Sequence, residues 1–300
     1  MVVINIDTME NNLSIVIPCF NEEKNILQLL TEISESFSET KIEVILVDDH
    51  SSIPLKNFVN LENFNFEIII LRNEYTRGQT YSIKLGIKNS NYDVIGLMDG
   101  DCQNPPSELF RLWKEFIKND LDAALSFRKN RKDNYRKRIS SFFGNRFSNF
   151  LTKSKLRDMG SSLKIVKKNL MVDILFDGDL HRFIGPILEF RNYKISEFGV
   201  EHRDRLSGHS NYGIGRIAPV LIDSVLFYLS KGFTKPLRYA LGRVSLYMFL
   251  FSSILLLVTI FQKIVLGNFI HTNPLFLISL FGYLLSIQVF TFGILKNIEN

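Results

Sequence analysis

Residues 94–103 read Val94-Ile95-Gly96-Leu97-Met98-Asp99-Gly100-Asp101-Cys102-Gln103. The apolar run that opens this stretch predicts a buried strand, and the two aspartates come directly after it. Two carboxylates two residues apart can offer hard oxygen ligands to one divalent cation, and such a cation can neutralise a diphosphate leaving group. Most isolated Asp-x-Asp pairs are solvated turn residues, so the rest of the chain has to decide between a turn and a metal site.

Short apolar runs elsewhere in the chain alternate with helical patterns. The runs predict strands at 13–18, 44–47, 67–71 and 94–98, with further candidates at 122–127, 161–166 and 194–200, and helices are expected after Asn21, at 78–86 and at 140–151. Such alternation predicts an α/β domain with a mostly parallel sheet flanked by helices. In such sheets ligands bind beyond the carboxyl ends of the strands, where residues 18–22, 48–51 and 99–103 all fall. We therefore expect one site built from these three segments.

The charge of the chain is unevenly distributed. The 300 residues carry a formal net charge of +5, and residues 128–157 are rich in Lys and Arg, with Asp133 as their one acidic residue. Such a run forms a solvated face, binds nucleic acid or attracts anionic lipid headgroups. The apolar segments farther along favour the lipid bilayer, and no nucleic-acid partner is expected. The two cysteines, Cys19 and Cys102, are far apart in the sequence and are interpreted as reduced thiols.

Two apolar segments lie near the C-terminal end of the sequence, at 244–261 and 275–295. Each is close to the roughly 20 residues that cross a bilayer as a helix. The breaker-rich residues 267–274 between them favour a turn, so the pattern predicts a transmembrane helical hairpin. A pair of buried core helices is the alternative interpretation of the same two segments.

Basic residues flank the expected hairpin mainly on one side. They are Lys231, Lys235, Arg238 and Arg243 before the first segment and Lys296 after the second, against Lys263 near the turn. This bias predicts a multi-pass protein of the cytoplasmic membrane with its large domain on the cytoplasmic side. The first twelve residues lack the basic region of a signal peptide. We expect a cytoplasmic domain at 1–212, amphipathic juxtamembrane helices at 213–243 and two transmembrane helices at 244–296.

Three motifs in the first third of the chain resemble the family 2 glycosyltransferases with the GT-A fold. They are Ile17-Pro18-Cys19-Phe20-Asn21-Glu22-Glu23, Val47-Asp48-Asp49-His50-Ser51 and Asp99-Gly100-Asp101-Cys102-Gln103-Asn104-Pro105-Pro106. With residues 203–212 and the apolar hairpin, the chain looks more narrowly like the branch of dolichol-phosphate mannose synthases and bacterial polyprenyl-phosphate glycosyltransferases. The resemblance has two departures: His50 stands where the family usually has Gly, and Asn211 replaces a common Lys.

The resemblance implies roles for individual residues of this chain. It implies that Asp99, Asp101 and Gln103 bind Mg²⁺ or Mn²⁺, that Pro18, Asn21, Glu22 and Asp49 bind the nucleotide of a sugar donor, and that Arg128, Arg138, Arg205 and Ser210 bind an acceptor phosphate. Asp101, Arg205 and Asp158 are the catalytic candidates. Asp158 lies in a D-x-G element, where capping a turn before Gly160 is the alternative role. Membrane-surface electrostatics is the alternative role for Arg128 and Arg138.

The expected activity is that of a membrane-anchored, inverting, metal-dependent hexosyltransferase. It would move a hexose from a UDP- or GDP-linked sugar to a polyprenyl phosphate. A lipid monophosphate is mostly dianionic at neutral pH and needs no strong base. If the acceptor is instead the hydroxyl of a lipid-linked saccharide or envelope glycan, a base is required and Asp158 is the candidate. A non-catalytic membrane partner that binds nucleotide sugar is the third alternative, and a homo-oligomer is compatible with the sequence.

Overall fold

The computed structural model describes residues 12–58, 64–129, 154–172, 180–203, 237–267 and 269–295. The chain divides into two compact units, Met1–Asp223 and Ser224–Asn300. The expected helix at 140–151, residues 213–236 of the expected juxtamembrane segment 213–243, and the candidate residues Arg138, Arg205 and Ser210 lie outside the described residues.

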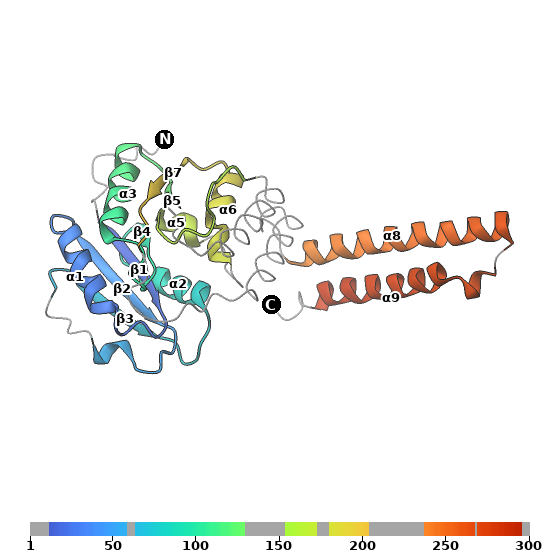
Figure 1. Cartoon of the computed structure of the whole chain (residues 1–300), viewed down its shortest axis with the longest axis horizontal. Coiled ribbons are helices and arrows are strands. Elements are labelled where there is room, and N and C mark those ends of the chain that lie inside the picture. Colours follow the sequence, from blue (N-terminus) through green and yellow to red (C-terminus); the bar gives the residue numbers. More distant parts are fainter. Residues whose placement is uncertain are drawn as a thin grey trace, which may run out of the picture. The chain divides into compact units, whose positions relative to one another are not determined.

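One mixed sheet is the centre of the first unit, with strand order β3-β2-β1-β4-β6-β5-β7 (Figure 1). The strands are β1 (Leu13–Cys19), β2 (Ile42–Asp48), β3 (Glu67–Arg72), β4 (Val94–Leu97), β5 (Ala123–Arg128), β6 (Lys164–Lys167) and β7 (Ile195–Val200). Every neighbouring pair is parallel except those of β6, which runs antiparallel to β4 and β5. The expected mostly parallel sheet is confirmed, and β6 is shorter than the segment 161–166 predicted for it.

Helices cover both faces of the sheet. They are α1 (Ile26–Ser36), α2 (Gln79–Lys88), α3 (Pro106–Lys118), α5 (Lys168–Val172) and α6 (Ile184–Phe190), with single 3₁₀ turns η2 (Leu55–Asn57) and η4 (Leu180–Phe183). Helices α1 and α3 pack on one another over the face to which β1 contributes Leu13, Ile15 and Ile17. Helix α2 covers the other face, where a side chain at Gly86 would collide with Val16.

The order of the strands explains where the site lies. From β1 the chain first builds outward through β2 and β3 and then returns to place β4 on the other side of β1. The carboxyl ends of β2, β1 and β4 are therefore adjacent at a point where the strand order reverses, which is the usual position of a ligand in an open α/β sheet. The three motif-bearing segments follow these three strands, as the sequence predicts.

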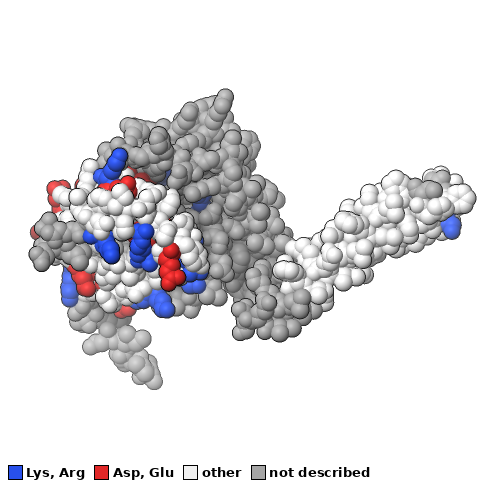
Figure 2. All heavy atoms as spheres, turned by 90° about the horizontal axis from the view of Figure 1, so that it is seen from below, with Lys and Arg blue, Asp and Glu red and all other residues white. Residues whose placement is uncertain are grey.

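The second unit is a pair of helices, α8 (Leu237–Leu266) and α9 (Pro274–Leu295), joined through the 3₁₀ turn η6 (Ile270–Thr272). They lie side by side in opposite directions (Figure 1). Two stretches, Leu241–Leu266 and Pro274–Gly293, are long and apolar enough to cross a membrane, with mean hydropathies of 2.3 and 2.0. Neither helix contains Asp or Glu, and the helices are almost entirely white in Figure 2.

Small polar side chains line the contact between α8 and α9. Ser245, Ser252 and Ser286 are buried there, and Ser286 Oγ donates a hydrogen bond of 2.9 Å to the Ser245 carbonyl. Most of the large apolar side chains on both helices are exposed instead. This distribution, small residues between the helices and large apolar residues outside, is typical of helices that pack within lipid. It disfavours the alternative of two buried core helices.

Candidate active site

The loop after β4 brings Asp99 and Asp101 to the end of the sheet. Gly100 permits this loop to lie close to β1, because a Cβ at that position would come within 3.2 Å of Cys19 Sγ. Asp101 is buried, and its Oδ1 accepts a hydrogen bond of 3.1 Å from the backbone N–H of Gln103. Cys102 holds a positive φ of 57°, which turns the chain sharply after the second aspartate. Residues 99–103, here called the aspartate loop, thus form a tight turn.

Asp99 has an unusual electrostatic environment. Its Oδ1 accepts a hydrogen bond of 2.8 Å from Gln79 Nε2, at the start of α2. Burial, followed by the neighbouring charge of Asp101, raises the pKa of Asp99 to about 6. A divalent cation would relieve this repulsion, and two protein carboxylates completed by substrate phosphates are a usual way to bind Mg²⁺. The donor atoms therefore fit such an ion, although no group of three or more His, Cys, Asp or Glu within the described chain is placed to hold one without substrate.

The loops after β1 and β2 are joined to one another through Asn21. Its backbone N–H donates to Ser51 Oγ at 2.9 Å, and its Oδ1 accepts from the Ser52 N–H at 2.8 Å. Asn21 and His50 both hold positive φ, 56° and 63°. Glycine adopts this conformation without cost, which explains in physical terms why Gly is usual at the position of His50. Glu22 completes the junction, because its side chain lies beside Gly100 of the aspartate loop.

The adjacent aspartates at the end of β2 hold two different loops. Asp49 accepts hydrogen bonds from Asn73 Nδ2 at 2.7 Å and from the N–H groups of Arg77 and Gly78 at 2.8 Å each. Asp48 accepts from the Ser51 N–H at 2.8 Å and forms an ion pair with Arg72. Both carboxylates therefore shape the rim of the site. The role of Asp49 in binding nucleotide stays a prediction.

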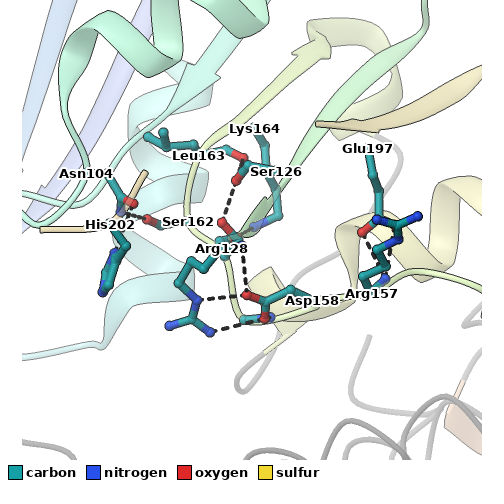
Figure 3. Close-up of polar contacts among 12 residues, drawn as sticks. Asn104, Ser126, Arg128, Arg157, Asp158, Ser162, Leu163, Lys164, Glu197 and His202 are labelled. Atoms are coloured by element: carbon teal, nitrogen blue, oxygen red, sulfur yellow. Dashed lines mark hydrogen bonds and ion pairs between the residues drawn. The ribbon is translucent and has the colours of Figure 1, made fainter. Parts of the chain in front are cut away.

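Arg128 and Asp158 form a two-pronged ion pair. Arg128 Nε donates to Asp158 Oδ2 at 2.7 Å and Nη2 donates to Oδ1 at 3.1 Å, as the dashed lines in Figure 3 show. The Gly160 N–H also donates to Oδ1, at 3.1 Å. The side chain of Asp158 is 5% exposed and that of Arg128 is 18% exposed. Arg128, a predicted acceptor-phosphate residue, and Asp158, a predicted catalytic candidate, thus lie in direct contact.

The segment after β7 is tied to the aspartate loop. The Arg203 N–H donates to the Gln103 carbonyl at 2.8 Å, and His202 Nδ1 lies 3.3 Å from Asn104 Oδ1. Asn104 Nδ2 in turn donates to Ser162 Oγ at 2.8 Å (Figure 3). These bonds hold the chain at Arg203, two residues before the acceptor candidate Arg205 in the sequence, against the aspartate loop.

A pocket opens beside Asp99 that sequence reasoning did not predict. Its polar lining comes from Gln79, Asp99, Ser161, Ser162, Lys164, His181 and Arg182, and Pro18 and Gly160 also border it. Burial lowers the pKa of Lys164 to about 8, against the opposing effect of Asp99. A lone lysine within the apolar run Leu163–Val166 was a signal for it in the sequence. Arg182 had no comparable signal, because the segment around it shows no clear periodicity.

The two cysteines flank the aspartate loop, and both are free and buried. Burial raises the pKa of Cys102 to about 12 and that of Cys19 well above its ordinary value. Both are therefore protonated at neutral pH, as expected for unreactive structural thiols.

Comparison with known proteins agrees with this geometry. The model of glycosyl transferase family 2 matches residues 14–174. A dodecaprenyl-phosphate galacturonate synthase of Rhizobium johnstonii is 32% identical over 296 residues, which are 95% of this chain and 86% of that protein. An undecaprenyl-phosphate 4-deoxy-4-formamido-L-arabinose transferase of Proteus mirabilis is 29% identical over 219 residues, 71% of this chain and 66% of that protein.

Solved structures show the same fold at lower identity. Glucosyl-3-phosphoglycerate synthase from Mycobacterium tuberculosis, solved with Mn²⁺, UDP-glucose and phosphoglyceric acid, has a TM-score of 0.57 and is 15% identical. The match covers 75% of this chain and 81% of that one. The fold, the order of the motifs and the extent of both sequence matches lead to one assignment: this chain belongs to glycosyl transferase family 2.

Proposed function

We propose that this chain is a membrane-anchored, metal-dependent, inverting glycosyltransferase that moves a hexose or related sugar from a UDP- or GDP-linked donor to a polyprenyl phosphate. The observation that carries the proposal is the meeting of the Asp99–Asp101 pair with the cationic group of Arg128 at one edge of the sheet, in a chain that ends in two membrane-length helices. The relatives from Rhizobium johnstonii and Proteus mirabilis are both named for transfer to a polyprenyl phosphate, with different sugars. The sugar is therefore the open part of the assignment.

The donor half of the proposed site consists of residues around the aspartate loop. Asp99 and Asp101, with Gln103, would hold Mg²⁺ or Mn²⁺, and Pro18, Asn21, Glu22 and Asp49 would bind the nucleotide. When bound, the ion supplies charge neutralisation for the departing diphosphate. The residues of the chain supply the position: the hydrogen bonds of Asn21 and Asp49 hold the loops after β1, β2 and β3 in fixed places.

The acceptor half of the proposed site is basic. Arg128, with Arg138, Arg205 and Ser210, would bind and orient the lipid phosphate, because a guanidinium offers a planar pair of donors to phosphate oxygens. A phosphate oxygen attacks C1 of the sugar, the bond from C1 to the diphosphate oxygen breaks, and the electron pair leaves with the nucleoside diphosphate. This displacement inverts C1 and consumes no proton, so no general base is needed.

The contacts of Asp158 favour a phosphate acceptor over a hydroxyl. Both of its oxygens already accept hydrogen bonds from Arg128. A base for a hydroxyl acceptor would have to leave this pair, whereas the orientation of Arg128 for a phosphate depends on it. We assign Asp158 the role of positioning Arg128. Asp158 would act as a base only if the acceptor were a hydroxyl group.

The remaining parts of the proposal concern location. Helices α8 and α9 would cross the cytoplasmic membrane, with the first unit on the cytoplasmic side, where nucleotide sugars and the lipid surface are both accessible. The proposed divisions are a catalytic domain at 1–212, juxtamembrane helices at 213–243 and the hairpin at 244–296. A homo-oligomer is compatible with this arrangement, and nucleic acid has no role in it.

Membranes containing the full chain provide the test. They are incubated with undecaprenyl phosphate and radiolabelled UDP- and GDP-sugars, with Mg²⁺, with Mn²⁺ or with a chelator. Metal-dependent label in a lipid that mild acid hydrolyses is the expected result. Label found only in acid-stable glycan would overturn the phosphate acceptor, and absence of transfer from every donor would favour a binding protein instead of an enzyme.

A further inference from the structure

The pocket beside Asp99 has an excess of positive charge. Lys164 and Arg182 line it, with His181 beside them, and Asp99 is the one carboxylate among its described lining residues. Lys164 is buried at 6% exposure and donates to the Ser161 carbonyl. Among the described residues neither Lys164 nor Arg182 forms a salt bridge. The nearby Asp158 is already paired with Arg128.

The fold holds these cations next to the aspartate loop. Lys164 is the first residue of β6 and lies opposite Leu97, two residues before Asp99. It follows Leu163, whose carbonyl accepts a hydrogen bond from Ser126 on β5 (Figure 3). Turn η4 carries His181 and Arg182, and it is fixed to α2 by a hydrogen bond of 2.8 Å between His181 Nδ1 and Thr80 Oγ1. The basic groups are therefore held in position by two separate elements, β6 and η4.

The positive charge of the pocket favours binding of an anionic group of the substrate. Burying a cation such as Lys164 against a neutral carbonyl alone is unfavourable, and an ionised ligand group that forms hydrogen bonds with the cation offsets that cost. Asp99 is committed to the donor diphosphate through the metal ion in the proposed function. Lys164 and Arg182 line the same pocket as Asp99. The sugar of a nucleotide sugar is attached to the diphosphate, so a diphosphate held at Asp99 would place the sugar within reach of these two cations.

We propose that this pocket receives the sugar of the donor and that the sugar is a uronic acid, whose carboxylate pairs with Arg182 and Lys164. The proposal rests on the proposed function and names the substrate class of the same site. Gln79, Ser161 and Ser162 supply hydrogen-bonding groups for the ring hydroxyls, and His181 borders the carboxylate. The neutral hexose with the same ring would leave both cations unpaired, so the pocket distinguishes the acid from its parent sugar.

Binding measurements on the purified full chain test this assignment without relying on turnover. Affinities with Mg²⁺ are compared for UDP-galacturonic acid against UDP-galactose, UDP-glucuronic acid against UDP-glucose, GDP-mannuronic acid against GDP-mannose, and UDP and GDP alone. We expect one acidic donor to bind at least about tenfold more tightly than its neutral partner, the factor typical of one charge-assisted hydrogen bond. Arg182→Gln should strongly reduce this preference, with Lys164 as the remaining cation, while leaving the affinity for the free nucleotide unchanged, and Arg182→Lys should retain more of the preference.

Two controls separate the possible failures. Arg191→Gln removes a cation that follows α6 and does not line the pocket, and it should keep the full preference for the acid. Equal or tighter binding of the neutral donors by the unchanged chain would overturn the uronic acid assignment. An equal loss of free-nucleotide affinity in Arg182→Gln would also overturn it, because the cation would then serve the diphosphate. Absence of binding of every nucleotide would overturn the proposed function itself, and with it the assignment.

Discussion

Arg128 and Asp158 are joined by two parallel hydrogen bonds of 2.7 and 3.1 Å, and Asp158 is almost fully buried. Paired forks of this kind fix the plane of the guanidinium as well as its position. The remaining N–H groups of Arg128 keep a defined direction while the carboxylate holds Nε and Nη2. The buried carboxylate of Asp158 thus holds the guanidinium of Arg128 in one orientation, which makes Asp158 a positioning residue.

The pair predicts different effects on acceptor and donor kinetics. Asp158→Asn should raise the KM for polyprenyl phosphate by about tenfold, since a charge-assisted bond is lost, and should change kcat and donor KM little. Arg128→Lys should have a similar effect, because an ammonium does not reproduce the fork. A large loss of kcat in Asp158→Asn, with the remaining activity rising steadily with pH, would instead identify Asp158 as a base.

The Asp99–Asp101 pair predicts the strongest effect on turnover. Asp101→Asn removes one of the two charged oxygen ligands and should lower kcat by at least about a hundredfold, the scale of lost electrostatic stabilisation of a leaving group. Membrane insertion should be unchanged, because α8 and α9 do not depend on the loop. Asp120→Asn, an exposed change outside the site, is the matched control. Full activity of Asp101→Asn, or activity in the presence of a chelator, would remove the metal role.

His50 carries backbone strain that can be measured as stability. A side chain at φ of 63° destabilises the folded chain by about 1–2 kcal/mol relative to glycine. Glycine in turn gains more freedom in the unfolded chain, which reduces the net stabilisation from His50→Gly by roughly 0.5–1 kcal/mol. His50→Gly should therefore raise the melting temperature slightly, despite loss of the weak 3.4 Å contact from His50 Nδ1 to the Asn73 carbonyl. His50→Ala keeps the strain without the ring and should lower it. The reverse order of the two variants would contradict the strained turn.

The packing of the hairpin predicts a cross-link. Ser245 Oγ and Ser286 Oγ lie 3.3 Å apart between α8 and α9, so cysteine sulfurs at these two positions would lie close enough to react with one another. With Cys19 and Cys102 replaced by Ser, the double variant Ser245→Cys with Ser286→Cys should form an intramolecular disulfide under mild oxidation. The pair Leu246→Cys with Ile287→Cys places both thiols on exposed surfaces and should not. Cross-linking only between separate chains would contradict the hairpin.

Much of the fold follows from local sequence patterns. The buried β-branched runs give the strands, and the motif-bearing segments fall at the carboxyl ends of β1, β2 and β4 because parallel neighbours end at one edge. The antiparallel direction of β6 cannot be predicted from these patterns. A short apolar run does not reveal which way its strand runs in the sheet, and the neighbours of β6 depend on the long connection that precedes it. The pairing of Arg128 with Asp158 and the place of Arg182 in the pocket could not be predicted either, because they depend on contacts between residues distant in sequence, whereas Lys164 left a signal as a lone lysine in an apolar run.

Asp48 predicts how the stability of the first unit depends on acid. Burial alone would raise its pKa, but hydrogen bonds from Ser51, Leu55 and Arg72 outweigh this and hold the pKa of Asp48 below its ordinary value. A depressed folded-state pKa contributes stability that is complete above the unfolded-state value of about 3.9 and is lost as pH falls through the folded-state value. Asp48→Asn should thus be less stable than the unchanged chain at pH 7, by about 1–3 kcal/mol.

The pH dependence separates this ionic effect from a purely steric one. Because the stabilisation requires the charged carboxylate, the difference in melting temperature between the two chains should stay constant from pH 7 to about pH 5 and shrink below about pH 4. Glu39→Gln, an exposed change, should show no comparable convergence. A difference that persists undiminished at the lowest pH would show that the Asp48→Asn variant is destabilised by shape or lost packing, and that the charge of Asp48 does not hold the loop after β2 in place.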